Sequence, residues 1–204
     1  MKLVVGTNNR HKLKEIRSIF EAGLPGKYDL LSINETLGRD IEIEETGSTL
    51  EENAYIKAKE LFDLTGLPCI SDDTGLEIDA LGGQPGVYSA RFAGQEGNDA
   101  ANRAKALKLL ESVPDEKRTA RFRTVICYIN DGAAEYLDGS VEGIIIREER
   151  GNAGFGYDPI FMPLGYSTTF AEMTEEEKNG ISHRGNAIRN LVKRLKGSGE
   201  VMKQ

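Results

Sequence analysis

The chain has 204 residues, of which 39% are hydrophobic and 29% are charged, and its formal net charge at pH 7 is -7. This length suffices for a sizeable core, and we expect a single domain over residues 1–204. The negative charge argues against binding to a nucleic acid polymer, which requires a basic surface. It is compatible with a small phosphorylated ligand, because a few basic side chains can be concentrated in one site.

Cysteine content and hydropathy favour a cytoplasmic protein. Cys69 and Cys127 lie in apolar, strand-like runs without a CxxC spacing, which predicts reduced core residues rather than a disulfide or a zinc site. No apolar run approaches the length of a membrane span. Residues 1–5 reach Gly6 too soon to hold the apolar core of a signal peptide. We therefore expect a cytoplasmic protein with no membrane contact.

The N-terminal segment has the pattern of a strand, a loop and a helix. Leu3–Val5 predicts a short buried strand. The helix after it carries three apolar residues on one face, namely Leu13, Ile16 and Phe20. Asn8 and Asn9 are both candidates for its N-cap.

The loop between this strand and helix, Gly6–Lys12, has features of an anion site. It presents backbone N–H groups and the positive end of a helix dipole, and Lys12 could reach back to a phosphate. It is not a Walker A loop, because His11 and Leu13 stand where that motif has Gly and Ser or Thr. An ordinary helix start with Lys12 in solvent is the alternative.

The most informative segment is Ser71–Gly75, which contains the adjacent carboxylates of Asp72 and Asp73. A second helix is predicted before it, from a capping box at Ser48 and Glu51. That helix continues to Gly66 and is followed by an apolar strand over 67–70. We expect this strand to end in a turn at the acidic pair and a further strand to cover 75–80.

Two adjacent carboxylates repel each other, so they usually need a hydrogen-bonding shell, a shared proton or a divalent cation. At the end of a buried strand such a pair lies where ligands bind in open α/β folds. A surface turn formed by Asp and Gly is the alternative interpretation.

The second half of the chain adds a helix, a hairpin and a last helix. The expected ranges are a helix at 99–112, strands at 119–130 and 135–146 joined antiparallel through Asp131-Gly132, and a helix ending near Gly197. Together these elements predict a mixed α/β fold with a long central β-sheet flanked by helices. We expect two lobes around a central cleft.

Two later motifs suit recognition of a flat, polar ligand. Gly154-Phe155-Gly156 places an aromatic ring between glycines, which would let a planar group approach the backbone and stack. Ser182-His183-Arg184 supplies fixed donors that could read the edge of a nucleobase. The alternatives are a glycine-rich turn with Phe155 in the core, and a helix start capped by Ser182.

Taken together, these motifs closely resemble the inosine triphosphate pyrophosphatase family, the Ham1/RdgB-type enzymes. The matching segments run through nearly the whole chain: 7–12, 51–54, 57–58, 71–76, 81–86, 89–92, 155–161 and 182–184. The resemblance implies an elongated α/β fold with a long mixed sheet and two lobes, usually assembled as a homodimer. It also implies hydrolysis of ITP, dITP and XTP to the nucleoside monophosphate and pyrophosphate, which removes these non-standard purine nucleotides from the nucleotide pool.

The family's residue roles carry over to this sequence as follows. The implied triphosphate contacts are Thr7, Asn8, Asn9, Arg10, His11 and Lys12. Asp73 would be the catalytic proton acceptor and a Mg²⁺ ligand, its proton affinity raised by Asp72, and Thr74 would touch substrate. The implied nucleotide contacts are Phe155, Gly156, Tyr157, Asp158, Lys178, His183 and Arg184. For a second Mg²⁺ ligand, an acidic residue before the second helix, we choose Glu44 over Glu42 and Glu45.

Three rival interpretations are considered. A Maf-type nucleotide pyrophosphatase has related chemistry but acts on other bases. A non-catalytic nucleotide sensor would bind nucleotide without metal-dependent turnover, which the intact acidic pair disfavours. Asp73-Thr74-Gly75 is also the triplet of aspartic proteases, but those enzymes need two such triplets or a shorter dimeric chain.

Overall fold

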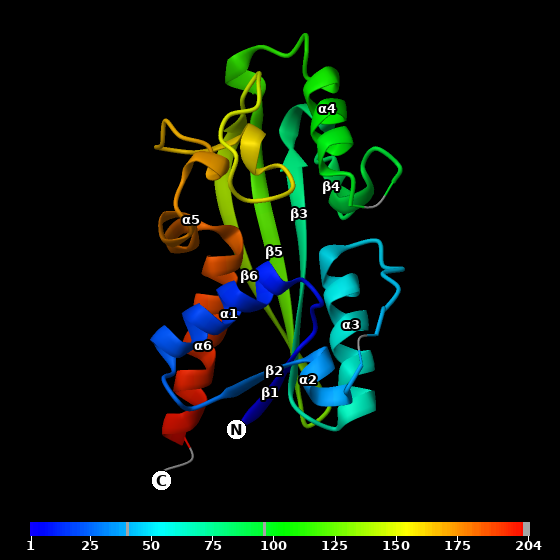
Figure 1. The fold of residues 1–204 in the computed structure, drawn as a ribbon, viewed down its shortest axis with the longest axis vertical. Coiled ribbons are helices and arrows are strands. Elements are labelled where there is room, and N and C mark those ends of the chain that lie inside the picture. The colour runs from blue at the N-terminus through cyan, green and yellow to red at the C-terminus, as the bar shows by residue number, and fades with distance from the viewer. Residues whose placement is uncertain (40, 96, 202–204) are drawn as a thin grey trace. The chain divides into compact units, whose positions relative to one another are not determined.

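The structure, a computed structural model, describes residues 1–39, 41–95 and 97–201, without the side chains of residues 11 and 198–201. The chain divides into two compact units, which are described separately (Figure 1). The first unit comprises Met1–Asp73, Thr124–Gly139 and the chain from Arg184 onward. The second unit comprises Thr74–Arg123 and Ser140–His183. A single domain over the whole chain stays a prediction.

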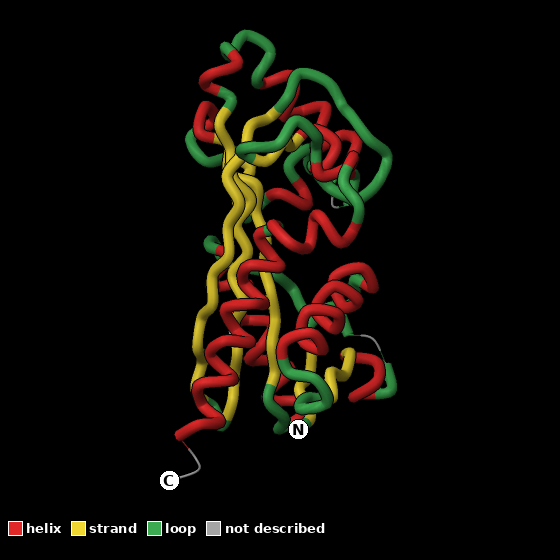
Figure 2. Tube along the Cα trace, turned by 90° about the vertical axis from the view of Figure 1, so that its left-hand side faces the viewer, coloured by secondary structure: helices red, strands yellow, loops and turns green. Residues whose placement is uncertain are grey.

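The described strands form a mixed sheet in the order β2-β1-β3-β5-β6-β7, with β4 paired to β3. Their bounds are β1 (Lys2–Val5), β2 (Asp29–Ser32), β3 (Cys69–Ile78), β4 (Pro85–Gly86), β5 (Thr119–Asn130), β6 (Ala133–Ile145) and β7 (Phe161–Pro163). β1 pairs parallel with β2 and β3, whereas β4 and β7 pair antiparallel with their neighbours. Strands β3, β5 and β6 contribute residues to both units, and Figure 2 shows the strands in yellow. The predicted mixed α/β class is confirmed.

Several helices have recognisable caps. Their bounds are α1 (Arg10–Gly23), α2 (Ile33–Leu37), α3 (Leu50–Thr65), α4 (Asp99–Leu109), α5 (Glu175–Ile181) and α6 (His183–Val201). Asn9 caps α1, since its Oδ1 accepts a hydrogen bond from the Lys12 N–H at 3.2 Å. Gly66 ends α3 in the left-handed region, with φ of 64°. Among the described residues, no helix has the length and apolar content to cross a membrane.

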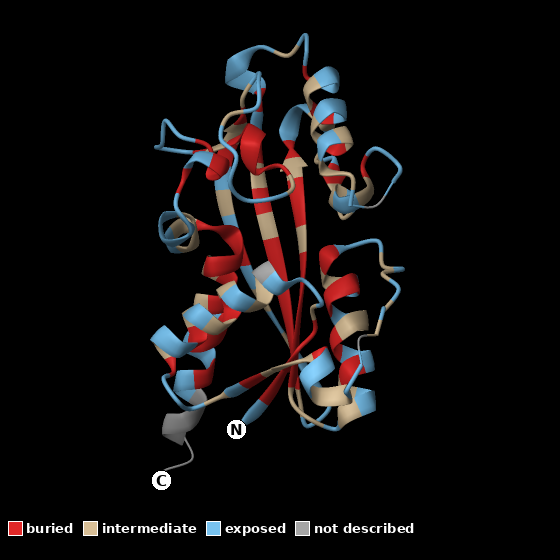
Figure 3. Ribbon diagram, viewed as in Figure 1, coloured by how far each residue is buried: buried red, intermediate tan, exposed pale blue. Residues whose placement is uncertain are grey.

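The core of the first unit has a helical layer on each face of its strands. Leu3 and Val5 face α1 and α6, whereas Val4 between them faces α2 and α3. This alternation follows from the two-residue period of a strand. In Figure 3 the helices carry both buried and exposed residues, while β3 is buried over most of its length, as expected for a strand covered on both faces.

The second unit has its own core, built from β3, β5, β6 and β7 with α4. Its buried members are Leu76, Ile78, Phe92, Ala106, Leu110, Ala120, Phe122, Ile145, Tyr157, Ile160, Phe161, Phe170 and Met173. Three phenylalanine rings form its centre, with centroids 4.7 Å apart for Phe122 and Phe161 and 5.2 Å apart for Phe161 and Phe170. Lys178 links one of these rings to the Phe155 motif, since its ammonium lies 5.4 Å from the Phe170 ring centroid and 4.9 Å from that of Phe155.

The main differences from the predicted boundaries lie in β3, α3, α4 and α6. β3 is one strand through the acidic pair, so the predicted turn at Ser71–Gly75 is wrong. The N-cap of α3 is Thr49, not Ser48, and its hydroxyl accepts from the Glu52 N–H at 3.1 Å. Helix α4 ends at Leu109 rather than residue 112, and α6 continues past Gly197.

Candidate active site

The acidic pair lies just beyond the point where the parallel pairing of β1 ends. Val5 pairs with Ile70, and the Gly6 N–H donates to the Ile70 carbonyl at 2.7 Å, after which β3 continues past the loop that follows β1 without β1 as a neighbour. The loop passes close to both β3 and α3, since a Cβ at Gly6 would lie 3.0 Å from Ser71 Cβ and 2.7 Å from Leu61 Cδ1. The carboxylates therefore lie beside the carboxyl end of the parallel strand β1, and not at the end of their own strand as predicted.

Asp72 faces the α1 and α6 side and is held as an anion. The Lys12 ammonium lies 3.1 Å from Asp72 Oδ2, and Arg184 Nε lies 3.4 Å from the same oxygen. Burial by itself would raise the pKa of Asp72, but the positive charges of Lys12 and Arg184 outweigh it and hold that pKa well below its usual range. Burial in turn lowers the pKa of Lys12.

Arg184 connects two carboxylates within the first unit. Its side chain is 2% exposed, and Nη1 donates to Glu15 Oε2 at 2.8 Å while Nε faces Asp72. Glu15 lies three residues after Lys12 on α1, so both side chains project from the same face of that helix. The predicted role of Arg184 in reading a base stays a prediction, and the contacts of its guanidinium with Glu15 and Asp72 are those of an electrostatic support.

Asp73 faces the opposite side, toward α3. Its Oδ2 accepts a hydrogen bond from Asn53 Nδ2 at 3.1 Å, and the Lys57 ammonium is 3.9 Å from Oδ1. Burial raises the pKa of Asp73 to about 6, with a further contribution from the charge of Glu45, and Lys57 opposes the rise only in part. The predicted high proton affinity is therefore present, but its main cause is burial rather than the neighbouring carboxylate.

Lys57 joins Asp73 to a second carboxylate, that of Glu45. The Lys57 ammonium forms a short hydrogen bond with Glu45 Oε1. Burial lowers the pKa of Lys57, but the negative charges of Asp73 and Glu45 outweigh it and raise that pKa overall. Glu44, the predicted metal ligand, is exposed. Burial alternates along residues 41–47, where Glu44 is exposed and Glu45 is partly buried, and it is Glu45 that lies beside Lys57.

The predicted phosphate loop forms a concave surface of the first unit. Thr7 Oγ1 accepts from the Asn9 N–H at 3.1 Å, and Asn8 Nδ2 donates to the Ile41 carbonyl at 2.9 Å. A pocket of 310 Å³ is lined by Thr7, Asn8, Asn9, Arg10, Leu13, Ser32 and Asn34. Four of the six predicted triphosphate contacts thus share one pocket. The side chain of His11, a fifth, lies outside the described residues.

In the second unit the predicted base contacts gather around Asp158. Its Oδ2 accepts the Phe155 N–H at 2.8 Å and pairs with the Lys178 ammonium at 2.5 Å. The same ammonium lies 4.9 Å from the centroid of the Phe155 ring, within cation–π range. A Cβ at Gly154 would lie 2.1 Å from Asp158 Oδ2, so this loop requires glycine there. Phe155 is 39% exposed, so its ring is accessible to a ligand.

His183 and Tyr157 are fixed by packing and hydrogen bonding within the same unit. The His183 ring is buried and stacks on Phe122, with centroids 4.6 Å apart and planes at 17°. The Tyr157 hydroxyl donates to the Ser89 carbonyl at 2.9 Å, and burial raises the pKa of that hydroxyl. The hydrogen bond of Tyr157 therefore holds the base-contact loop, whereas the His183 ring packs in the core of this unit.

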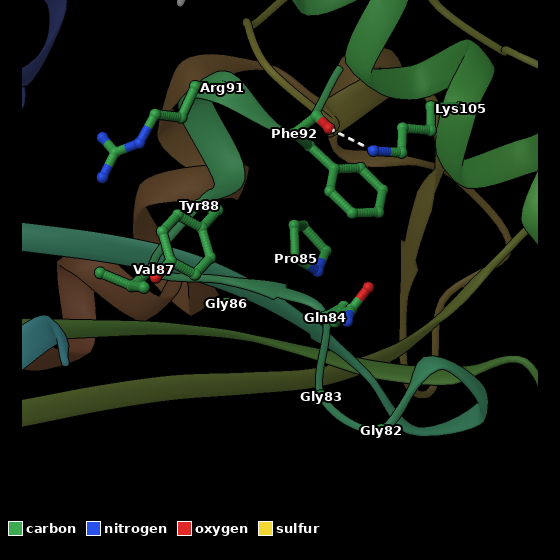
Figure 4. A pocket seen from close by; sticks show the side chains of 10 residues that line it. All are labelled: Gly82, Gly83, Gln84, Pro85, Gly86, Val87, Tyr88, Arg91, Phe92 and Lys105. Carbon is green, nitrogen blue, oxygen red and sulfur yellow. Dashed lines mark hydrogen bonds between the residues drawn. The ribbon is translucent and has the colours of Figure 1, made fainter. Parts of the chain in front are cut away.

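A separate pocket of 490 Å³ lies elsewhere in the second unit (Figure 4). It is lined by Gly82, Gly83, Gln84, Pro85, Gly86, Val87, Tyr88, Arg91, Phe92 and Lys105. The Lys105 ammonium donates to the Phe92 carbonyl at 2.6 Å and lies 4.3 Å from the Phe92 ring centroid. None of the predicted site residues lines this pocket.

The structure thus brings the predicted residues together in two groups, one in each unit. The first group contains the phosphate loop, Asp73 and Arg184, and the second contains the motif around Phe155, with Lys178 and His183. Sequence reasoning gave no site role to Asn53 or Glu15. A signal existed for both, since Asn53 lies four residues before Lys57 and Glu15 three after Lys12 on predicted helices.

Comparison with known proteins gives consistent matches over nearly the whole chain. A model of the Ham1 family matches residues 3–194. A dITP/XTP pyrophosphatase of Desulforamulus reducens is 49% identical over 196 residues, 96% of this chain and 96% of that protein. One of Porphyromonas gingivalis is 50% identical over 190 residues, 93% of this chain and 95% of that protein.

Solved structures show the same fold. The Ham1 protein of Staphylococcus aureus is similar with a TM-score of 0.86 and 39% identity, over 97% of this chain and 100% of that chain. A nucleoside-triphosphatase / dITP/XTP pyrophosphatase of Mycobacterium abscessus has a TM-score of 0.76 and 43% identity, over 94% and 98% of the two chains. Sequence and fold therefore give the same assignment.

Proposed function

Because the chain belongs to the Ham1 family, we propose that it is a nucleoside triphosphate pyrophosphatase that hydrolyses dITP, XTP and ITP. The products are the nucleoside monophosphate and pyrophosphate, and the reaction would remove these nucleotides from the cytoplasmic pool. Assembly as a homodimer belongs to the same proposal.

The observation that best supports this reaction is the divergent electrostatics of two consecutive carboxylates. Asp72 is held ionised by Lys12 and Arg184, whereas the pKa of Asp73 is raised to about 6. A general base works best when its pKa lies near the working pH. Asp73 is therefore suited to accept a proton near neutral pH. Asp72 instead holds the side chains of Lys12 and Arg184 in place.

In the proposed reaction Asp73 accepts the proton of the attacking water as the bond between the α- and β-phosphates breaks. The hydrogen bond from Asn53 holds one carboxylate oxygen of Asp73 in place. The ammonium groups of Lys12 and Lys57 lie beside the acidic pair. Their positive charge would stabilise the negative charge that accumulates on the leaving pyrophosphate. The phosphate loop would bind the triphosphate through its backbone N–H groups and polar side chains.

The residues around Lys57 fit a divalent cation. Asp73 and Glu45 direct two carboxylates at the single Lys57 ammonium, so this site already accommodates positive charge. Within the described residues no three His, Cys, Asp or Glu side chains form a metal site by themselves. The two carboxylates at Lys57 suit Mg²⁺, which commonly takes one or two carboxylates and completes its shell with water and substrate phosphates. When bound, the ion would neutralise phosphate charge and acidify a bound water.

We place the second Mg²⁺ ligand at Glu45 instead of Glu44. The Glu45 carboxylate contacts Lys57, and its charge contributes to the raised pKa of Asp73, whereas Glu44 is exposed. The proposed ligands are therefore Asp73 and Glu45.

The nucleobase is proposed to bind to the second unit. The Phe155 ring offers an exposed aromatic face backed by the Lys178 ammonium, a suitable surface for stacking a purine. A donor such as His183 of the same unit would select the 6-oxygen of hypoxanthine and xanthine over the 6-amino group of adenine. Sites built on such hydrogen bonds discriminate by up to roughly 10⁴–10⁵-fold.

The test is product analysis with dITP, XTP, ITP, ATP and GTP, with and without Mg²⁺, measuring pyrophosphate and orthophosphate separately. We expect Mg²⁺-dependent pyrophosphate from the first three and little product from ATP or GTP. Orthophosphate as the phosphate product, or equal rates on all five, would contradict the proposal.

Asp73→Asn should lose several orders of magnitude in turnover while remaining folded, and Glu77→Gln, on the same strand in the second unit, is the matched control.

A further inference from the structure

Helix α4 holds the peptide groups on both sides of Gly156, directly after Phe155. The Gly156 N–H donates to Asp99 Oδ2 at 2.7 Å, and the Gly156 carbonyl accepts from Arg103 Nη1 at 2.9 Å. Asp99 and Arg103 are four residues apart on α4, so they project from one face of that helix. All of these residues belong to the second unit.

Arg103 also fastens the start of the same loop. Its Nε pairs with Glu149 Oε1 at 2.8 Å, and the Arg103 side chain is only 15% exposed. One guanidinium therefore connects residue 149 with Gly156, across the segment that carries Phe155. Gly156 has a φ of 61°, in the left-handed region, so the loop turns sharply at the point where it is held.

Stability of α4 does not account for these contacts. The helix is capped by Asn98, whose side chain accepts from the Ala101 N–H at 3.1 Å. It is anchored in the core by Ala106, which is fully buried. An acidic residue in the first turn stabilises a helix through the helix dipole. Asp99 would make this contribution without any contact to Gly156. The contacts with Gly156 serve the loop.

We propose that Asp99 and Arg103 are positioning residues for nucleobase binding, which hold the peptides around Gly156 so that the Phe155 ring is presented to the base. This inference rests on the proposed function. Asp158 and Lys178 hold the loop from its other side, through the Phe155 N–H and ring. A ring that is fixed before the ligand arrives loses less conformational entropy on binding, which increases affinity.

The experiment compares Arg103→Ala, Asp99→Ala and Asp99→Asn with the full-length wild-type protein on ITP. We expect Arg103→Ala and Asp99→Ala to raise KM about tenfold with kcat within about twofold, as for loss of a hydrogen bond to a charged group. Asp99→Asn keeps an acceptor for the Gly156 N–H and should restore most of the affinity. Competitive inhibition by inorganic pyrophosphate, which has no base, should be unchanged in all three.

The matched control is Arg147→Ala in the same unit. Arg147 also pairs with a carboxylate, that of Asp115 at 2.7 Å, and donates to backbone carbonyls, but none of these contacts involves the loop. It should keep the wild-type KM.

Two failures are distinguishable in this design. Wild-type protein that releases no pyrophosphate from ITP, dITP or XTP would contradict the proposed function itself. An active wild type with unchanged KM in Arg103→Ala and Asp99→Ala would overturn the positioning role alone. Equal weakening of ITP and pyrophosphate would also overturn it, because that pattern indicates a general structural defect. If Arg103→Ala fails to fold, the comparison of Asp99→Ala with Asp99→Asn decides the question.

Discussion

Asp72 and Asp73 are consecutive on β3, and their side chains point to opposite faces of the sheet. Asp72 contacts Lys12 and Asp73 contacts Asn53. This follows from the alternation of side chains along a strand. The two carboxylates consequently do not need to share a proton, although they are neighbours in sequence. Each has its own set of partners, and those sets move the two pKa values in opposite directions.

The partners of Asp72 predict a large stability cost for its neutralisation. Asp72→Asn would leave the buried charges of Lys12 and Arg184 without this anion, and breaking a buried ion pair from one side typically costs about 3–5 kcal/mol. Urea unfolding monitored by circular dichroism measures this loss. Asp115→Asn, whose ion pair with Arg147 is exposed, should change stability by less than about 1 kcal/mol. Equal effects in the two variants would show that the buried network is not stabilising.

Asp73 predicts the opposite effect, with a defined dependence on pH. The pKa of Asp73 in the folded protein, about 6, lies above the ordinary value of 3.8. The favourable contribution of this carboxyl group to the free energy of unfolding is therefore fully present below pH 3.8 and is lost as the pH rises through 6. Asp73→Asn should therefore be more stable than wild type above pH 6, by at most about 3 kcal/mol. The advantage should shrink toward pH 4. Thermal unfolding from pH 4 to 8 in EDTA tests this, and an advantage independent of pH would contradict the burial of Asp73.

Sequence patterns identified the fold class and most elements, and the errors have physical causes. At the start of α3, Ser48-Thr49 is followed by Glu51-Glu52, which allows two capping registers one residue apart. The structure uses Thr49, and Glu52 accepts from the Ser48 N–H and hydroxyl. Local pattern alone does not choose between these registers.

The turn predicted at the acidic pair was wrong for a different reason. Asp and Gly favour turns locally, but the cations that make a strand possible here come from distant segments, with Lys12 on α1, Lys57 on α3 and Arg184 on α6. Two short helices, α2 and α5, were missed although each has a complete capping box, at Ser32 with Glu35 and at Thr174 with Glu177. That signal was available in the sequence.

The choice between Glu44 and Glu45 shows where site prediction from sequence ends. The resemblance placed an acidic ligand before the second helix, but three glutamates satisfy that description. Only the direction of each side chain separates them, and Glu45 is the one that contacts Lys57. That direction depends on how residues 41–47 pack against α3, which no local pattern encodes.

This difference predicts a contrast in Mg²⁺ dependence. Glu45→Gln should raise the Mg²⁺ concentration for half-maximal activity about tenfold or more, because it removes one of two proposed carboxylate ligands. Glu44→Gln is the matched control, since Glu44 is exposed, and its Mg²⁺ titration should coincide with wild type. Titrations at saturating ITP measure both. A shift in Glu44→Gln alone would return the ligand to the residue first predicted.

The exposed ring of Phe155 predicts an effect on base binding alone. Phe155→Leu keeps an apolar side chain but removes the aromatic face, and stacking of a base is worth about 1–3 kcal/mol. KM for ITP should therefore rise at least about fivefold, while kcat changes little because the proposed proton acceptor is Asp73 of the first unit. Tyr166→Leu removes another exposed ring of the second unit, 47% exposed, and should leave KM unchanged. Steady-state kinetics on ITP separates these outcomes, and an equal KM in Phe155→Leu and wild type would remove Phe155 from the base site.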